Sequence, residues 1–278
     1  MAPSSTSAPA GASTTDGAPA MMMALLYGLL ASAAFPVGVL LALVWKIPRR
    51  VLASIIAFGA GTLVVALTFE LMAEAIERAA VVYAIVGLFA GALVYITLDA
   101  LLDRMARRSP RVEGTSPGDV KPGAAAIPES PAQATVSGTA VLIGAVIDGV
   151  PESAAIGMGL AADKGLGIVL LGAVFLSNLP EAIASTTGMR QAGRSMAYVI
   201  AAWGLVMALC VASTVAGYAL LGDLAPAGRS ALFAFAAGGI LAMLSDTMFP
   251  EAFKNGGPWV ALATTAGFAV SILLGQLE

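Results

Sequence analysis

Two copies of one short motif hold the residues of this sequence best suited to bind a cation. The copies are Ile147-Asp148-Gly149-Val150-Pro151-Glu152-Ser153-Ala154 and Leu176-Ser177-Asn178-Leu179-Pro180-Glu181-Ala182-Ile183. Residues four apart share one face of a helix, so each Glu is expected beside the polar residue four positions before it. A proline inside a helix cannot donate a backbone hydrogen bond, which frees the carbonyl four residues earlier. Each helix is therefore expected to offer a carboxylate, a second oxygen and a free carbonyl at one depth, a set of ligands typical of a cation site.

The candidate metal ligands come from these two motifs and from the single cysteine. They are Asp148, Glu152, Ser177, Asn178, Glu181 and Cys210. Each has a purely structural alternative. The acids could be protonated and hydrogen-bonded to a neighbouring helix, Ser177 and Asn178 could hold helices together, and Cys210 could serve in packing.

Composition places the chain in the membrane class. Hydrophobic residues make up 59% of the 278 residues and charged residues 11%, against roughly 25% charged in an average soluble domain. The net charge of −3 is too small to indicate binding to nucleic acid. With one cysteine no internal disulfide can form. The lipid bilayer is the expected environment, and no cofactor is predicted.

Apolar stretches of roughly 20 residues, long enough to cross a bilayer, predict an all-α protein with eight spans. The expected spans are 21–45, 52–75, 81–103, 137–161, 166–188, 197–221, 230–251 and 258–276. Residues 1–20 form a low-complexity segment that we expect to be a disordered tail. The stretch 104–135, rich in Pro, Gly and Ser, is expected to be a mobile cytoplasmic loop.

The distribution of Lys and Arg predicts the orientation, because cytoplasmic loops carry an excess of both. Most of the 14 basic residues follow the first, third, fifth and seventh spans: Lys46, Arg49, Arg50, Arg104, Arg107, Arg108, Arg111, Lys121, Arg190, Arg194 and Lys254. Both termini are therefore expected on the non-cytoplasmic side of the cell (inner or plasma) membrane.

An internal repeat suggests how the spans are grouped. Residues 57–75 align with 234–252 at an offset of 177, with identities at Ala57, Phe58, Ala60, Gly61, Leu67, Glu74 and Ala75. By the orientation above, the second and seventh spans run in opposite directions. Three spans, a central pair with the Pro-Glu motifs, and three more spans form a 3+2+3 inverted-repeat plan, which is typical of transporters with a midplane site.

These motifs resemble a known family. Asp148-x-x-Pro151-Glu152 and Ser177-Asn178-x-Pro180-Glu181 are similar to the paired His-Asn-x-Pro-Glu and His-(Glu/Asn)-x-Pro-Glu signatures of ZIP metal transporters, and the segments 57–75 and 234–252 resemble that family's second and seventh helices. The resemblance extends from about residue 21 to the end. It implies an eight-helix transporter that moves a divalent metal such as zinc, iron or manganese into the cytoplasm.

The chain departs from that family by having no histidine. Asp148 and Ser177 stand where the family has His, and Gly149 replaces the usual Asn. A carboxylate-rich site suits hard cations such as Mn²⁺, Mg²⁺ or Ca²⁺. Zinc stays open, because carboxylates also bind it and Cys210 or Met207 could add a softer ligand.

Two other classes of function were weighed. An intramembrane enzyme is not expected, because without histidine neither Ser-His catalysis nor a His-x-x-x-His zinc site can form. The alternative to a metal transporter is a degenerate relative that carries another solute, such as a hard cation or a proton, or that acts as a scaffold. A homodimer is compatible with the sequence, which leaves the oligomeric state open.

Overall fold

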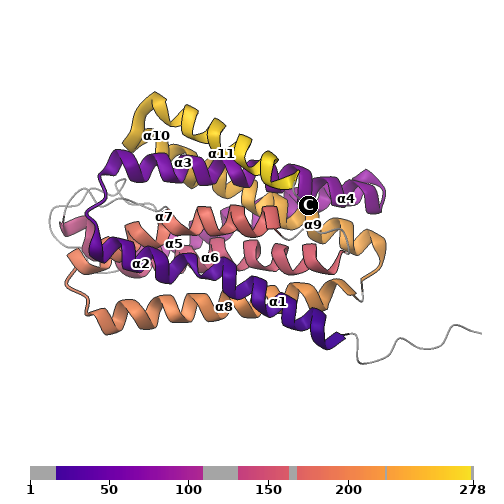
Figure 1. The fold of residues 1–278 in the computed structure, drawn as a ribbon, viewed down its shortest axis with the longest axis horizontal. Coiled ribbons are helices and arrows are strands. Elements are labelled where there is room, and N and C mark those ends of the chain that lie inside the picture. Colours follow the sequence, from indigo (N-terminus) through magenta and orange to yellow (C-terminus); the bar gives the residue numbers. More distant parts are fainter. Residues whose placement is uncertain (1–16, 109–130, 163–167, 223, 277–278) are drawn as a thin grey trace, which may run out of the picture.

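The structure is a computed structural model that describes residues 17–108, 131–162, 168–222 and 224–276. Within these ranges the chain is helical and contains no strand, and its helices lie side by side in a bundle (Figure 1). The elements are α1 (Gly17–Ser32), α2 (Ala34–Val44), α3 (Arg49–Val65), the π-helix η1 (Ala66–Met72), α4 (Ala73–Arg78), α5 (Val81–Arg108), α6 (Pro131–Ala161), α7 (Ile168–Gln191), α8 (Met196–Gly222), α9 (Pro226–Met243), the π-helix η2 (Leu244–Met248), α10 (Phe249–Gly256), the 3-10 turn η3 (Gly257–Trp259) and α11 (Val260–Gly275).

Six segments of the described chain are long and apolar enough to cross a membrane. They are Pro19–Val44, Arg49–Arg78, Val81–Leu101, Ile168–Gln191, Met196–Leu221 and Pro226–Gly275. The last has 50 residues and contains a break at Gly257, whose φ of +67° suits a residue without a side chain. The expectation of an all-α membrane protein is confirmed. The count of eight spans and their 3+2+3 grouping stay predictions, although helix is found in all eight expected ranges.

Helix ends differ from the expected boundaries at two places. Helix α1 begins at Gly17, so the last residues of the segment expected to be a tail are helical, while residues 1–16 lie outside the described residues. Helix α5 continues to Arg108 and α6 begins at Pro131, which shortens the expected loop 104–135 from both ends. Proline is well suited to a helix start, because the first turn has no use for its missing N–H. Residues 109–130 lie outside the described residues, so the expected mobility of that loop stays a prediction.

The first expected span, 21–45, is divided into two helices. Helices α1 and α2 are separated at Ala33, three residues before Pro36. Because Pro36 has no N–H and its ring crowds the preceding turn, a break at this point is expected.

Glycines bring three pairs of helices into backbone contact: α3 with α11, α5 with α9, and α6 with α8. A Cβ added to one of these glycines would lie inside contact distance of a carbonyl oxygen on the partner helix: Gly61 at 2.1 Å from Thr264, Gly91 at 1.9 Å from Phe235, and Gly157 at 1.9 Å from Thr214. In lipid, where water does not drive helices together, such close contact supplies much of the association energy.

The two π-helices fall at matching positions of the internal repeat. Moving η1 (Ala66–Met72) by the repeat offset of 177 gives residues 243–249, and η2 covers Leu244–Met248. The sequence identities in this repeat therefore coincide with an irregularity of the backbone that the two copies share.

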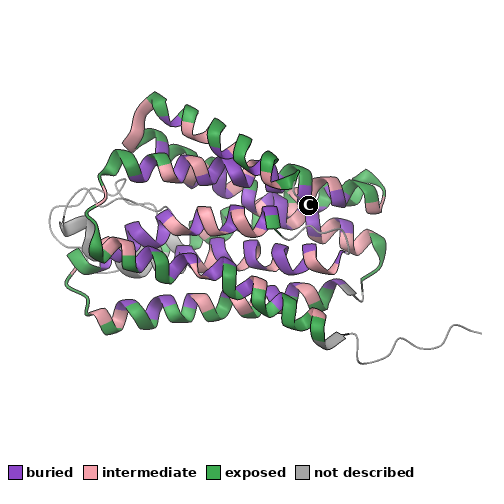
Figure 2. Ribbon diagram, viewed as in Figure 1, coloured by how far each residue is buried: buried purple, intermediate pink, exposed green. Residues whose placement is uncertain are grey.

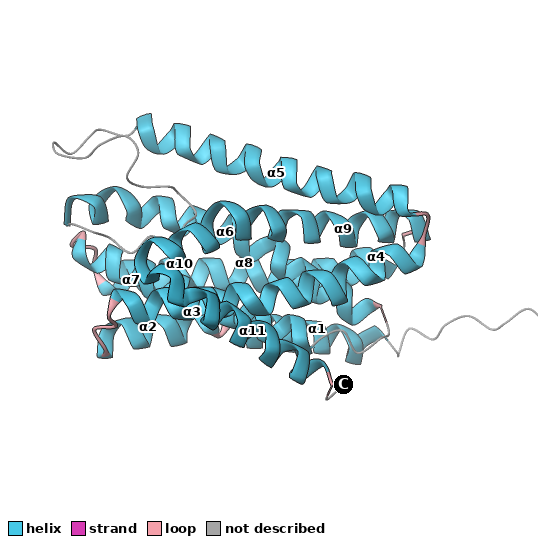
Figure 3. Ribbon diagram, turned by 90° about the horizontal axis from the view of Figure 1, so that it is seen from above, coloured by secondary structure: helices cyan, strands magenta, loops and turns pink. Residues whose placement is uncertain are grey.

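Helix α7 runs through the middle of the bundle and is largely buried (Figure 2), whereas α8 lies at an edge in the view of Figure 1 and α5 at an edge in the view of Figure 3. In the apolar window of α7, 67% of the residues are buried, against 22% in that of α5. Large exposed side chains on α5, such as Val86, Phe89 and Leu93, suit contact with lipid. The Pro-Glu motif of α7 is thus held in the best-shielded part of the protein.

The close contact of α3 with α11 leads to the first prediction. We expect Gly61→Ala to lower the free energy of unfolding by about 1–3 kcal/mol, because the new methyl group meets the Thr264 carbonyl. The control is Gly204→Ala, where nothing lies within 4 Å of the added carbon. Thermal unfolding of the purified protein in detergent measures both changes, and equal stability of the two variants would contradict the packing described here.

Candidate metal site

Helices α6 and α7 pack against each other and carry the two Pro-Glu motifs in their interiors. Pro151 lies inside α6 and Pro180 inside α7, as the sequence predicts. The surrounding apolar residues keep both helices continuous through the proline, so each Glu stays on the helix face of its polar partner.

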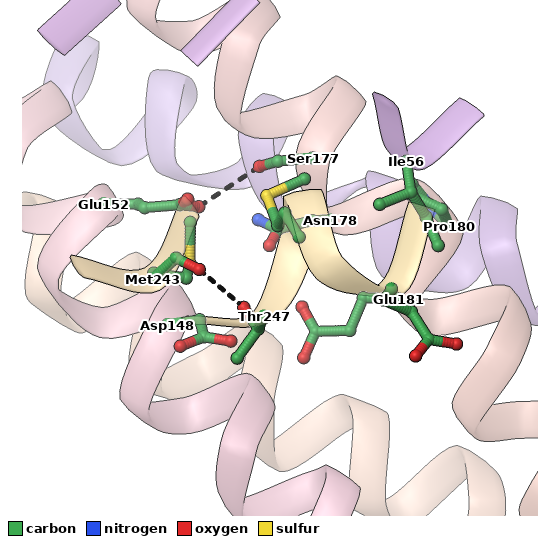
Figure 4. Close-up of a pocket in the computed structure, with 11 residues that line it drawn as sticks. Ile56, Asp148, Glu152, Ser177, Asn178, Pro180, Glu181, Met243 and Thr247 are labelled. Carbon is green, nitrogen blue, oxygen red and sulfur yellow. Dashed lines mark hydrogen bonds between the residues drawn. The ribbon is translucent and has the colours of Figure 1, made fainter. Parts of the chain in front are cut away.

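One pocket brings the two motifs together (Figure 4). It encloses about 370 Å³ of space not occupied by atoms, part of it open to solvent. The lining residues come from α3, α6, α7 and the segment α9–η2–α10: Ile56, Asp148, Glu152, Ser177, Asn178, Pro180, Glu181, Met243, Thr247, Met248 and Glu251. Five of the six predicted metal ligands therefore line a single pocket.

A direct contact joins the two motif copies. The Ser177 hydroxyl lies 3.4 Å from Glu152 Oε2, to which it donates, and 3.0 Å from the Val174 carbonyl of its own helix (Figure 4). Glu152 is 1% exposed, so this hydroxyl supplies one of the few donors within its reach. Ser177 thus holds α7 to the carboxylate of α6.

Four oxygen atoms in the pocket are buried without a hydrogen-bond partner among the described residues. They are Asp148 Oδ1, Glu152 Oε1, Asn178 Oδ1 and Glu181 Oε1. The lining contains no Lys or Arg, so no cation of the lining compensates these three carboxylates, and Glu251 adds a fourth acid to it. Buried acceptors without donors are costly, and a carboxylate within a span costs roughly 2.5–3.5 kcal/mol on insertion scales. A positive ion among these oxygens would offset that cost.

The acids of the pocket do not converge on one point. Among the described residues, no three Asp, Glu or Cys side chains lie close enough together to hold a metal ion. The motif residues share a pocket but leave its centre open. Binding through all three carboxylates would require side-chain rotations toward a common position.

One of the carbonyls that proline frees is covered by another helix. Pro180 leaves the Leu176 carbonyl without its helical donor, and a Cβ added to Gly59 of α3 would lie 2.8 Å from that oxygen. The backbone of α3 thus packs directly on the irregular turn of α7. The expectation that this carbonyl faces a cation finds no support in its position.

Cys210 lies away from the pocket lining. Its thiol is buried in an apolar cluster with Phe35, Val206 and Trp203, and a Cβ on Gly149 would meet its sulfur at 2.9 Å. The replacement of the family's Asn by Gly149 leaves room for this sulfur. Met207 packs against the same cluster. These positions favour the packing alternative for both residues.

The structure adds pocket residues that the two motifs did not reveal. The additional lining residues come from segments distant in sequence and are Ile56, Met243, Thr247, Met248 and Glu251. A signal in the sequence could have found Thr247, because it lies in the repeat segment 234–252.

The glutamate that the two copies of the repeat share, Glu74 in the first and Glu251 in the second, has a different partner in each copy. Glu74 forms an ion pair with Arg78, and Arg78 also donates to the Ala162 carbonyl at the end of α6 at 3.4 Å. At the equivalent positions, Glu251 accepts a hydrogen bond of 2.7 Å from the Asn255 amide. Of these two glutamates, only Glu251 lines the pocket.

Comparison with known proteins leaves the family open. The sequence matches no model of a known protein family, and no curated protein matches it significantly. The resemblance to ZIP transporters therefore rests on the two Pro-Glu motifs and the repeat, and membership stays a prediction.

The second prediction compares two buried glutamates that differ in their partners. We expect metal-free Glu152→Gln to be at least as stable as the parent, because it removes a carboxylate that no protein cation compensates. Glu74→Gln should instead lose about 1–3 kcal/mol, since it leaves Arg78 without its partner. Thermal unfolding in the presence of a chelator measures both, and a larger loss for Glu152→Gln would show that its charge is already compensated.

Proposed function

We propose that this protein transports a divalent metal cation, of the zinc, iron or manganese type, across a membrane through the pocket between α6 and α7. The observation that carries the proposal is the set of four buried, unpartnered oxygens from Asp148, Glu152, Asn178 and Glu181 in one pocket without a basic residue. Ionisable residues inside spans are expensive and usually serve function. A divalent cation is the ligand that such a set of acceptors would stabilise most.

The proposed architecture is the eight-span, 3+2+3 inverted-repeat plan of the ZIP family. Its support is the presence of helix in all eight expected ranges and the matching π-helices at the repeat offset. In this plan the pocket belongs to the central pair of spans and is completed by the second repeat segment and by Ile56, next to the first segment. We place the protein in the cell (inner or plasma) membrane with both termini non-cytoplasmic, on the distribution of Lys and Arg.

The ligand chemistry favours a hard or borderline cation. Seven of the eleven lining residues carry carboxylate, amide or hydroxyl oxygens, which suit Mn²⁺ and Fe²⁺ and also Mg²⁺ or Ca²⁺. Met243 and Met248 supply thioether sulfur at the pocket wall, a softer donor that keeps zinc among the candidates. Cys210 is not needed for either choice.

A second candidate function follows from the open centre of the pocket. Since no three acids within the described ranges lie close enough together to hold a metal, a degenerate relative that acts as a scaffold or carries another solute is the alternative. The two differ in a simple respect. A transporter must bind the ion, whereas a scaffold has no need to bind it.

The third prediction tests binding and transport together. Divalent metal should raise the unfolding temperature of the parent, because a ligand stabilises the state that binds it. Glu152→Gln and Glu181→Gln should each abolish this stabilisation, and also metal uptake into vesicles containing the reconstituted protein. The control is Glu77→Gln, an exposed glutamate on α4 that does not line the pocket.

Each outcome separates the candidates. Metal-dependent stabilisation and uptake that both fail in the two pocket variants would support the transporter. Stabilisation that survives in both variants would move the site elsewhere. A parent that is neither stabilised by metal nor active in uptake would favour the scaffold.

The fourth prediction concerns pH. Carboxylates bind a cation in their ionised form, so protons compete with the metal and binding should weaken as pH falls. With no histidine in the chain, carboxylates alone must account for this effect. Calorimetry in buffers of different ionisation enthalpy should count protons released between about pH 5 and pH 8. Metal binding without any proton release across that range would show that the acids were already ionised or do not touch the ion.

A further inference from the structure

One end of the bundle gathers basic residues next to exposed tryptophans. Figure 1 shows the end of α2, the start of α3 and helix α10 together at the left of the molecule. The connection from α2 to α3, the first turn of α3 and the segment from α10 to η3 carry these side chains. We call them the basic patch: Lys46, Arg49, Arg50 and Lys254, with Trp45 and Trp259 beside them.

Apolar packing holds the two segments of the basic patch together. Ile47 of the first segment packs against a buried cluster that contains Ala53 of α3 and Ala252 of α10. A Cβ added to Gly256 would lie 3.1 Å from Ala53 Cβ, so the end of α10 lies directly on α3. The basic side chains are therefore parts of one surface, although the two segments lie far apart in sequence.

The side chains of the basic patch are open to the surroundings. All four basic residues are exposed, and the exposed fraction is 62% for Trp45 and 77% for Trp259. Within the two segments, 45–50 and 251–259, the only acidic residue is Glu251, to which Asn255 donates a hydrogen bond. The two segments therefore place an excess of positive charge on an exposed surface.

The order of residues puts this surface at the boundary between the bilayer and water. The apolar helix α2 ends at Val44, which is 78% exposed, and Trp45 and then Lys46 follow it. In α10 the exposed Phe253 directly precedes Lys254. Tryptophan concentrates at the membrane interface, and Lys and Arg extend their charged ends from there into the headgroup layer. The basic patch therefore lies at the depth of the lipid phosphates.

We propose that the basic patch binds the headgroup of an anionic phospholipid. Its cations would face the negative groups of the headgroup, and its two tryptophans would lie against the lipid below. The distribution of Lys and Arg predicts that this end is cytoplasmic, and anionic lipids give the cytoplasmic leaflet a negative surface potential. A zwitterionic lipid has the same phosphate but no net charge, so the patch should distinguish the two. This inference is independent of the proposed metal site.

The three tryptophans of the chain allow an optical test. Trp203 is 3% exposed and donates to Thr186 Oγ1 at 3.0 Å, so it is shielded from lipid. Brominated lipids quench tryptophan on contact, and the quenched part of the fluorescence therefore reports Trp45 and Trp259. In vesicles of mixed composition, we expect brominated phosphatidylglycerol to quench at a lower mole fraction than brominated phosphatidylcholine, by about fivefold for each basic residue that contacts the headgroup.

A matched pair of variants tests whether the patch causes this preference. Lys46→Gln with Arg50→Gln removes two charges and should lower the preference for phosphatidylglycerol about fivefold or more. Lys46→Arg with Arg50→Lys keeps both charges and should keep the preference. A further control is Arg229→Gln, which removes one charge near the start of α9, at the opposite end of the continuous helical run that leads to α10. It should leave the preference unchanged.

The outcomes decide the proposal. Equal quenching of the parent by the two brominated lipids would overturn it, and so would a preference that survives in Lys46→Gln with Arg50→Gln. Relief of the quenching by inorganic phosphate would show that the patch binds a free anion and would overturn the assignment to lipid.

A measurement on the parent alone does not need any variant to fold. Raising the salt concentration from about 0.1 M to about 1 M shortens the screening length from about 10 Å to about 3 Å. The preference for phosphatidylglycerol should fall over this range, because charge is its cause. A preference that does not change with salt would contradict the proposal.

Discussion

Three carboxylates without a protein counter-charge are the constraint on which the centre of this structure depends. Asp148, Glu152 and Glu181 lie in a shielded pocket whose lining has no basic residue. Such a pocket is stable only if the surrounding helices are fixed by other means. Glycine contacts between helix backbones, as at Gly61 and Gly157, supply that packing independently of the acids. The bundle therefore does not need these acids for its cohesion, and they are available for a ligand.

The internal repeat shows how one element serves two purposes. In the first copy, Glu74 is neutralised by Arg78, which also reaches the end of α6, so this copy fastens helices together. In the second copy, Asn255 stands in place of the arginine and donates to Glu251, which lines the pocket. The residue four positions after the shared glutamate therefore differs between the copies, an arginine that reaches another helix in the first and an asparagine in the second.

The π-helix η2 lies where the second repeat segment lines the pocket. An extra residue in a turn rotates the side chains that follow relative to those before it, and such turns are frequent at functional sites. In η2 the irregular turn carries Thr247, which lines the pocket. Its counterpart in η1, Glu70, is also buried, so both irregular turns point a polar side chain into the protein.

The sequence by itself determined the membrane class, the helical ranges and the pairing of the two Pro-Glu motifs. These depend on hydropathy and on spacings of a few residues, which are local properties of the chain. It did not determine which distant residues complete the pocket, such as Met243 and Thr247, or that Gly59 covers the Leu176 carbonyl. Nor did it determine that Cys210 packs in an apolar cluster away from the pocket or that the acids stop short of a common point. Those features follow from the rotation and close approach of helices far apart in sequence, which only the tertiary packing decides.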